Sequence, residues 1–268
     1  MQYQFTEFKN ARIRFTDKGK GRAIVLLHGF PLSLDIWNEF SETLSKKFRV
    51  ICIDLPGHGE SDCIGYVHSM ELMAECVKAI MNVLHLRKYI LVGHSMGGYA
   101  TMAFAELFPD NIKGICLFHS SALADSESKK KDRERSIQLV KKHPKQFTNQ
   151  LAENLFFVKN RARFKNEIAL LKKNFSNTSQ RSIIACLYGM KDRKNREMIL
   201  KFAAYPILFI IGKNDTIIPM EMILPQTELP EKKEILLLDK VGHAGFYEAK
   251  NEILERLIAF SKKCFSNG

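Results

Sequence analysis

The amino-acid sequence predicts an α/β protein with a mainly parallel, doubly wound sheet of eight strands and an inserted helical segment. Short, continuously apolar runs alternate along the chain with longer segments whose apolar residues recur at helical spacing. Strands that are apolar throughout are buried on both faces, which is typical of a parallel sheet covered by helices on both sides. The chain has 268 residues, of which 46% are hydrophobic and 26% charged, so it suits one large domain with a sizeable core.

The expected strands begin with a hairpin. Residues 3–16 alternate apolar and polar around Lys9-Asn10, which predicts two antiparallel strands joined by a tight turn. Six apolar runs follow and complete the sheet: Ala23–Leu27, Arg49–Ile53, Tyr89–Val92, Gly114–Phe118, Ile207–Ile211 and Ile235–Leu238.

Helical patterns fill the intervals between these runs. Residues 35–47 carry Ile36, Phe40 and Leu44 at helical spacing. A long amphipathic helix is expected from Ser69, a suitable N-cap, to Leu86. Further helices are expected over residues 99–105 and, at the end of the chain, over 246–262.

Residues 122–201 interrupt this alternation. They contain no strong strand signal but do contain helical patterns with basic polar faces, for example at 137–140 and 164–175. The segment lies between two expected sheet strands, so we expect a helical cap inserted over the carboxyl edge of the sheet. The core domain would then consist of residues 1–121 and 202–268.

The net charge of +12 is concentrated in the same segment. Residues 122–201 hold 20 Lys and Arg against 8 Asp and Glu, which accounts for the whole net charge of the chain. A basic cap can attract a substrate with an acidic group. Solvated amphipathic helices without such a role would show the same excess of positive charge. The segment shows no exposed aromatic residues interleaved with its basic ones and no recognised nucleic-acid-binding motif, so no nucleic-acid partner is expected.

The remaining composition predicts a cytoplasmic protein without a cofactor or metal. No apolar stretch approaches the roughly 18 residues of a membrane span, so no membrane association is expected. Residues 1–7 have neither the basic start nor the apolar stretch of a secretory signal. Six cysteines without metal-like spacing are expected to be reduced thiols, several in the core: Cys52, Cys63, Cys76, Cys116, Cys186 and Cys264.

The sequence around Ser95 is typical of a catalytic serine. Residues 93–97 read Gly-His-Ser-Met-Gly, directly after an apolar strand and directly before a helical segment. A serine on such a strand-to-helix turn has strained backbone angles and an exposed hydroxyl. The N-terminus of the following helix favours developing negative charge. These features predict a nucleophilic serine.

A serine hydroxyl needs a base, which is a histidine oriented by a carboxylate in the commonest arrangement. Asp215 follows the strand at 207–211, and His243 follows the strand at 235–238. Carboxyl ends of parallel strands share one edge of the sheet, where ligands bind. Ser95, Asp215 and His243 are therefore the expected catalytic residues.

An acyl-transfer serine also requires an oxyanion hole, usually made by two backbone N–H groups. Met96, directly after Ser95, supplies one by its position. Phe30, after the strand at 23–27, is the expected second donor, since Pro31 has no N–H. His28 and the loop at 57–61 are interpreted as structural.

Together these motifs resemble the α/β-hydrolase fold superfamily along nearly the whole chain. The motifs that carry the resemblance are HGFP at 28–31, DLPGHGES at 54–61, GHSMGG at 93–98, GKND at 212–215 and GH at 242–243. The resemblance implies that Ser95 becomes acylated, that His243 acts as general base and then general acid, and that Asp215 orients His243. A serine at the elbow also separates the chain from the dehalogenases and epoxide hydrolases of this fold, which carry aspartate there, and from the dienelactone hydrolases, which carry cysteine.

The expected function is hydrolysis of a small or medium carboxylic ester, with a small-molecule substrate that carries an acidic group if the basic cap contributes. The alternatives are a cofactor-free perhydrolase or haloperoxidase, a non-catalytic ligand-binding protein, and the pyruvate-eliminating lyase of the menaquinone pathway. Tyr99 and His94 depart from that lyase, which commonly has arginine and tyrosine at these positions. The sequence gives no sign of the oligomeric state. Candidate substrate-binding residues near strand ends are Leu34, Trp37, Phe118, His119 and Phe246.

Overall fold

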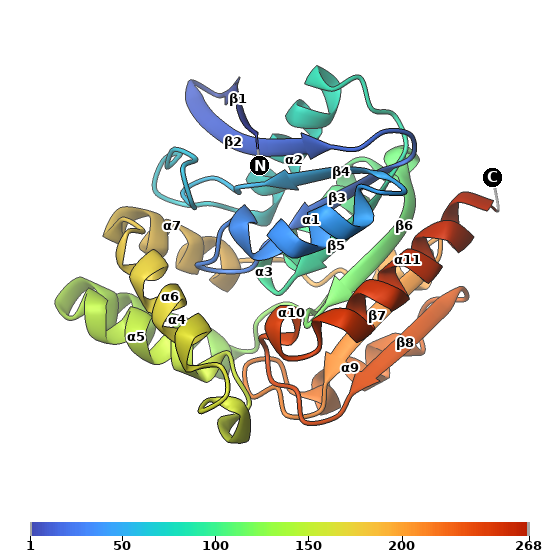
Figure 1. Cartoon of the computed structure of the whole chain (residues 1–268). Helices are drawn as coiled ribbons and strands as arrows, with labels where there is room; N and C mark the ends of the chain where they lie inside the picture. Colours follow the sequence, from blue (N-terminus) through green and yellow to red (C-terminus); the bar gives the residue numbers. More distant parts are fainter. Residues whose placement is uncertain (1, 267–268) are drawn as a thin grey trace.

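The computed structural model describes residues 2–266 and has the predicted architecture of a central sheet between layers of helices (Figure 1). The eight strands lie in the order β1-β2-β4-β3-β5-β6-β7-β8. Pairs β1–β2 and β2–β4 are antiparallel, and the other neighbouring pairs are parallel. The strands are β1 (Tyr3–Phe8), β2 (Ala11–Lys18), β3 (Ala23–Leu27), β4 (Arg49–Ile53), β5 (Tyr89–His94), β6 (Ile112–Phe118), β7 (Ile207–Gly212) and β8 (Lys233–Leu238).

The first hairpin turns at Lys9 and Asn10, as the alternating pattern predicts. Both residues have positive φ, 52° and 60°. A two-residue turn of this kind matches the twist of the paired strands. It brings Phe8 opposite Ala11, so the alternating residues of β2 pack one face onto the core.

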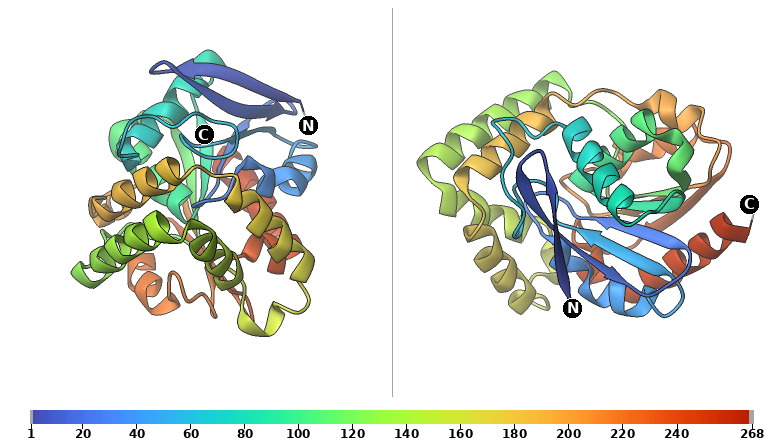
Figure 2. Two further views of the ribbon diagram at one scale, coloured as in Figure 1. Left: turned by 90° about the vertical axis from the view of Figure 1, so that its left-hand side faces the viewer. Right: turned by 90° about the horizontal axis from the view of Figure 1, so that it is seen from above.

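Helices cover both faces of the sheet (Figure 2). The alternation along β3 shows this, because Val25 and Leu27 belong to one hydrophobic cluster while Ile24 and Leu26 belong to the other. The first cluster contains the apolar sides of α2 (Met70–Val83), α3 (Met96–Leu107), α8 (Glu197–Lys201) and α9 (Met220–Thr227); the second contains those of α1 (Asn38–Leu44) and α11 (Lys250–Ser266). This double burial explains why the parallel strands are apolar throughout.

Two expected helices are each divided in the structure. Residues 34–44 form a 3₁₀ helix η1 (Leu34–Trp37) and then α1, because the Ser33 side chain caps a separate first turn. Residues 245–266 form α10 (Gly245–Glu248) and α11, separated at Ala249, whose backbone (φ −137°, ψ 34°) is not helical. By contrast, Ser69 caps α2 as expected, accepting a hydrogen bond from the Leu72 N–H.

The segment at 122–201, here called the helical insertion, lies beside the carboxyl ends of the strands (Figures 1 and 2). Its two ends are joined by a hydrogen bond of 2.8 Å from the Arg196 N–H to the Ala122 carbonyl. Arg193 also binds the Asp125 carboxylate at 2.5 Å, so the chain leaves the insertion beside the place where it enters. Before its final helix α8, the insertion contains α4 (Glu127–Lys142), α5 (Pro144–Asn154), η3 (Val158–Asn160), α6 (Lys165–Ser176) and α7 (Gln180–Lys191); one further 3₁₀ helix, η2 (Pro109–Asn111), precedes β6.

Candidate active site

Ser95 lies on the sharp turn between β5 and α3 with φ 50° and ψ −116°. Few residues other than glycine adopt such angles, and their strain persists only where surrounding contacts hold the backbone. The Ser95 N–H donates to the Phe118 carbonyl at 2.9 Å, and the Ser120 hydroxyl donates to the Ser95 carbonyl at 2.7 Å. These contacts hold the strained turn from β6, and the Ser95 side chain is half-buried at the surface of the turn.

Two glycines allow this turn to form. A Cβ atom on Gly93 would lie 2.4 Å from the Gly97 carbonyl oxygen, and one on Gly97 would lie 2.4 Å from the Leu27 carbonyl oxygen. Both neighbours are backbone atoms that cannot rotate away. Only glycine therefore lets β5, α3 and the end of β3 approach this closely.

Asp215 and His243 meet at the ends of β7 and β8. The distance from His243 Nδ1 to Asp215 Oδ2 is 2.6 Å, and Asp215 Oδ1 accepts hydrogen bonds from the Ile217 and Ile218 N–H groups. Burial raises the pKa of Asp215, but the charge and hydrogen bond of His243, together with His119 and the Ile218 N–H, more than offset this, so the pKa lies below its usual value. Asp215 is thus held as a carboxylate that fixes the orientation of His243.

His94 links this pair to the serine turn. His94 Nε2 lies 2.9 Å from the His243 backbone carbonyl, and the centres of the two rings are 4.8 Å apart. A carbonyl oxygen only accepts, so His94 carries its proton on Nε2. Burial lowers the pKa of His94 and keeps the ring neutral. The residue next to Ser95 therefore contacts His243 directly, and the three predicted residues lie at one edge of the sheet.

The two expected oxyanion donors lie beside this turn. Within residues 2–266, neither the Phe30 nor the Met96 backbone N–H donates to a protein acceptor. Met96 is the first residue of α3, where N–H groups have no partner within the helix. Both N–H groups are therefore without a protein acceptor among the described residues.

A family model described as the alpha/beta hydrolase fold matches residues 22–250 of the chain. The chain belongs to this family. Its fold and the esterases among its structural neighbours support hydrolase activity.

Three proteins show how far the likeness extends. A dihydrolipoyllysine-residue acetyltransferase component of the acetoin cleaving system of Pseudomonas putida is 27% identical over 255 residues; the match covers 91% of this chain and 64% of that protein, so the chain spans less than two thirds of this relative. A pimeloyl-(acyl-carrier protein) methyl ester esterase of Pseudoalteromonas atlantica is 26% identical, covering 88% of this chain and 93% of that protein. A thermophilic esterase of Thermogutta terrifontis, solved with malate bound, superposes with a TM-score of 0.91 at 28% identity over 98% of this chain and 99% of that one.

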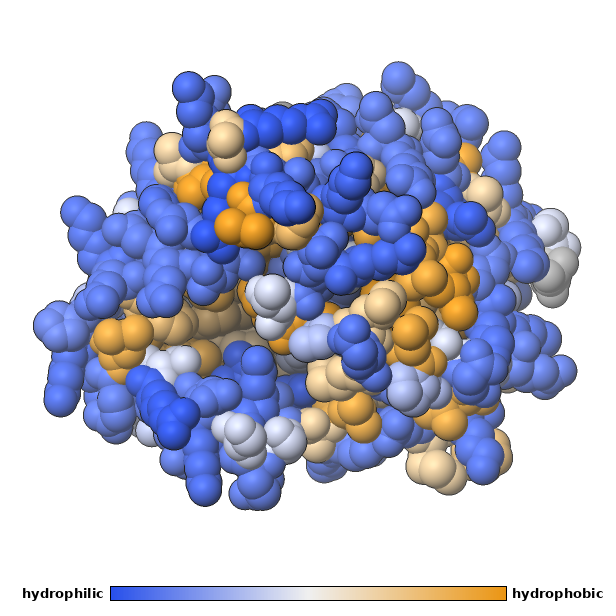
Figure 3. Space-filling view, turned by 90° about the horizontal axis from the view of Figure 1, so that it is seen from below, coloured by the Kyte–Doolittle hydropathy of each residue, from blue (hydrophilic) through white to orange (hydrophobic). Residues whose placement is uncertain are grey.

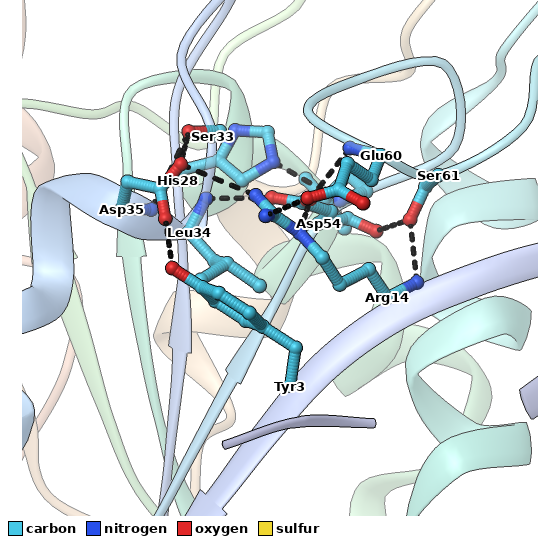
Figure 4. Close-up of polar contacts among 10 residues, drawn as sticks. Tyr3, Arg14, His28, Ser33, Leu34, Asp35, Asp54, Glu60 and Ser61 are labelled. Carbon is cyan, nitrogen blue, oxygen red and sulfur yellow. Dashed lines mark hydrogen bonds and ion pairs between the residues drawn. The ribbon is translucent and has the colours of Figure 1, made fainter. Parts of the chain in front are cut away.

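In this α/β hydrolase, Asp54 holds together the loops that flank the site (Figure 4). Its Oδ2 atom accepts from Arg14 Nε at 2.5 Å and from the Glu60 N–H at 3.0 Å, while Oδ1 accepts from the Leu34 N–H at 2.7 Å. His28 belongs to the same arrangement, since its Nε2 accepts from the Leu55 N–H at 3.0 Å. These contacts join β2 to the loops after β3 and β4, which is the structural role expected for His28 and the loop at 57–61.

Removing the Asp54 carboxylate is expected to destabilise the protein strongly. Asp54 is fully buried and Arg14 nearly so. An Asp54→Ala variant leaves a buried guanidinium without this partner, which lowers the free energy of unfolding by about 3–5 kcal/mol. Urea unfolding of the variant and the wild type measures the loss. Asp239→Ala, which removes an exposed partner of Lys213, is the control and should cost at most about 1 kcal/mol. Equal losses in the two variants would contradict the role given to Asp54.

The five candidate substrate-binding residues lie in the interior. Their exposed fractions are all 1% or less, so none presents an open surface to a ligand. Trp37, Phe118 and Phe246 belong to the hydrophobic cluster beneath α1 and α11. His119 lies behind the acid: its Nδ1 accepts from the Gly212 N–H at 3.1 Å and is 3.5 Å from Asp215 Oδ2. The fifth candidate, Leu34, is buried in η1.

The surface is hollowed on the side of the insertion, and hydrophobic side chains form the floor of the hollow (Figure 3). One apolar contact between the insertion and the loop after β3 is made by Phe147 of α5, whose ring centre is 6.4 Å from that of Phe30. Both side chains are half-buried. The sequence does not single out Phe147, because helical periodicity in a polar segment does not show which residue contacts Phe30.

Arg193 is a second insertion residue near the serine turn. Its guanidinium carbon lies 4.0 Å from the centre of the Tyr99 ring, one turn into α3. Its Nε donates to the Leu123 carbonyl, and its Nη1 donates to Asp125 and to the Met190 carbonyl. The guanidinium therefore fastens both ends of the insertion to α3.

The described residues show neither a group of metal ligands nor a membrane-spanning helix. Within residues 2–266, no three His, Cys, Asp or Glu side chains are grouped so that they could hold a metal ion. In the same range, none of the helices has both the length and the apolar character needed to cross a bilayer.

Proposed function

We propose that this α/β hydrolase cleaves a small or medium carboxylic ester through a covalent intermediate on Ser95. The observation that carries the proposal is the 2.6 Å contact of His243 with the buried Asp215 carboxylate, next to a strained serine turn. This arrangement supplies a nucleophile, a base and an orienting acid in the order typical of the family.

The chemistry follows from the positions of these groups. In the proposed reaction, Ser95 Oγ attacks the ester carbonyl carbon while His243 Nε2 takes the hydroxyl proton. Asp215 holds the Nδ1 proton and stabilises the imidazolium that forms. The Phe30 and Met96 N–H groups bind the oxyanion. His243 then gives the proton to the alcohol as the ester C–O bond breaks, which leaves the acyl group on Ser95. A water molecule next attacks the acyl carbon while His243 takes its proton, and His243 returns that proton to Ser95 Oγ as the acid leaves.

The substrate class follows from the surroundings of the site. We propose that residues 122–201 act as a cap over Ser95, with Phe30 and Phe147 contributing apolar surface for a short or medium acyl chain. The excess of positive charge in this segment would attract an ester that also carries an acidic group. The relative from P. atlantica, which is named a methyl ester esterase, supports an ester substrate.

Activated esters test the proposal. With a 4-nitrophenyl ester at enzyme concentrations in the micromolar range, we expect an initial burst of nitrophenolate equal to the enzyme concentration, because acylation precedes slower release of the acid. A panel of such esters that varies acyl length, with and without a terminal carboxylate, then defines the substrate class. Binding without turnover across the whole panel would favour a ligand-binding role instead.

A further inference from the structure

Glu248, the last residue of α10, connects the insertion to the loop that carries His243. Its Oε2 atom accepts from the Gly242 N–H at 2.8 Å. Its Oε1 atom accepts from the Phe157 N–H at 3.0 Å and from Asn160 Nδ2 at 2.6 Å. Gly242 directly precedes His243, whereas Phe157 and Asn160 belong to the insertion. One carboxylate thus binds donors from two segments more than 80 residues apart in the chain.

The same two segments are also joined through their backbones. The N–H groups of His243 and Ala244 both donate to the Leu155 carbonyl, at 2.7 and 2.8 Å. Asn160 Nδ2 donates in addition to the Lys240 carbonyl at 2.7 Å. The loop at 240–244 is therefore bound along its length to residues 155–160 of the insertion.

These contacts and the contact with His94 engage different backbone groups of His243. The His243 N–H is bound by the insertion through Leu155, and its carbonyl is bound by His94, the residue before the serine. Both polar backbone groups of His243 are thus occupied by residues from elsewhere in the chain. Phe156 packs parallel to Tyr247, with 6.0 Å between ring centres and 9° between ring planes, and strengthens the same junction.

We propose that residues 155–160 of the insertion position the catalytic histidine, and that Glu248 is the positioning residue that fastens them to its loop. The inference rests on the proposed function, in which His243 is the base. It gives the insertion a role in the chemical step in addition to any role in covering the substrate. Small displacements of a catalytic group lower kcat steeply, because proton transfer depends on its distance and angle to the reacting atoms.

Two substitutions test the proposal from opposite sides of the junction. Glu248→Gln keeps the shape of the side chain but turns an NH₂ group toward a backbone N–H. Asn160→Ala removes two hydrogen bonds from the insertion side and leaves the core residues unchanged. It is therefore the second test variant if Glu248→Gln folds poorly. Glu255→Gln, a change at an exposed position of α11, is the matched control. The measurements are kcat and KM on an activated ester, and hydrogen exchange at the His243 and Ala244 amides.

We expect kcat to fall about tenfold in both junction variants while KM changes by less than about twofold. Exchange at the His243 and Ala244 amides should become faster, with exchange in α2 unchanged. A purely structural role would instead lower the active fraction and speed exchange throughout the protein. Unchanged kcat in folded junction variants of an active enzyme would overturn the proposal.

The exchange measurement needs no substrate and so separates the two proposals. If the wild type turns over no ester, the proposed function fails. Unchanged exchange at His243 and Ala244 in both junction variants overturns the positioning role whether or not the wild type is active.

Discussion

Replacing Ser95 with alanine is expected to lower kcat/KM for an activated ester by about 10⁴-fold or more, because no acyl-enzyme can form without the hydroxyl. The variant should also lose all labelling by a fluorophosphonate, which reacts with an activated serine. Intact-protein mass spectrometry measures labelling, and steady-state kinetics measures turnover. Since Ser95 has φ 50°, alanine inherits the same backbone strain, so folding should change little.

Ser128→Ala is the matched control for this experiment. Ser128 is exposed on α4, within the insertion, and its substitution should leave labelling and turnover as in the wild type. Stoichiometric labelling that persists in Ser95→Ala would show that another residue is the nucleophile.

The second large effect is expected for Asp215→Asn, which should lower kcat by about 10⁴-fold. An amide in place of the carboxylate no longer stabilises the imidazolium form of His243. It also favours the ring tautomer with the proton on the wrong nitrogen. Asp239→Asn, at an exposed position near the end of β8, is the control and should retain full activity. A fall in kcat of less than about tenfold in Asp215→Asn would contradict the orienting role.

The same variant should alter how thermal stability depends on pH. The pKa of Asp215 is lower in the folded protein than its usual value, so its ionised form favours folding. This contribution is complete above the unfolded pKa of about 4 and is lost as pH falls through the lower folded pKa. The difference in Tm between wild type and Asp215→Asn should therefore be constant near neutral pH and shrink below about pH 4. A difference that grows on acidification would contradict the lowered pKa.

The fold was predictable because its strands have an unusual composition. β3 and β4 were expected with the bounds that they have in the structure, since residues buried on both faces form continuous apolar runs. The relation of Ser95, Asp215 and His243 was predictable for a related reason. Parallel strands bring their carboxyl ends to one edge, so polar residues after separate strands are brought together whatever their distance along the chain.

The contacts around the site could not be predicted in this way. Glu248 was not distinguished from other glutamates, because its partners Phe157 and Asn160 lie far away in the chain and two of its three donors are backbone N–H groups that every residue type has. The candidate pocket residues were expected from their nearness to strand ends. Nearness to an end does not specify the face of the sheet, and Trp37 and Phe118 point into the core beneath α1 and α11.

The hydrogen bonds from His243 and Ala244 to the Leu155 carbonyl have a consequence for protein engineering. Exchanging the whole helical insertion for that of a relative is one way to seek a new specificity. In this protein such a graft would also replace the backbone support of His243, the proposed base. A chimera that transplants the segments on either side and keeps the native chain path at 155–160 would preserve that support. Because the acceptor is a backbone carbonyl, the path of the main chain matters there more than the identity of the side chain.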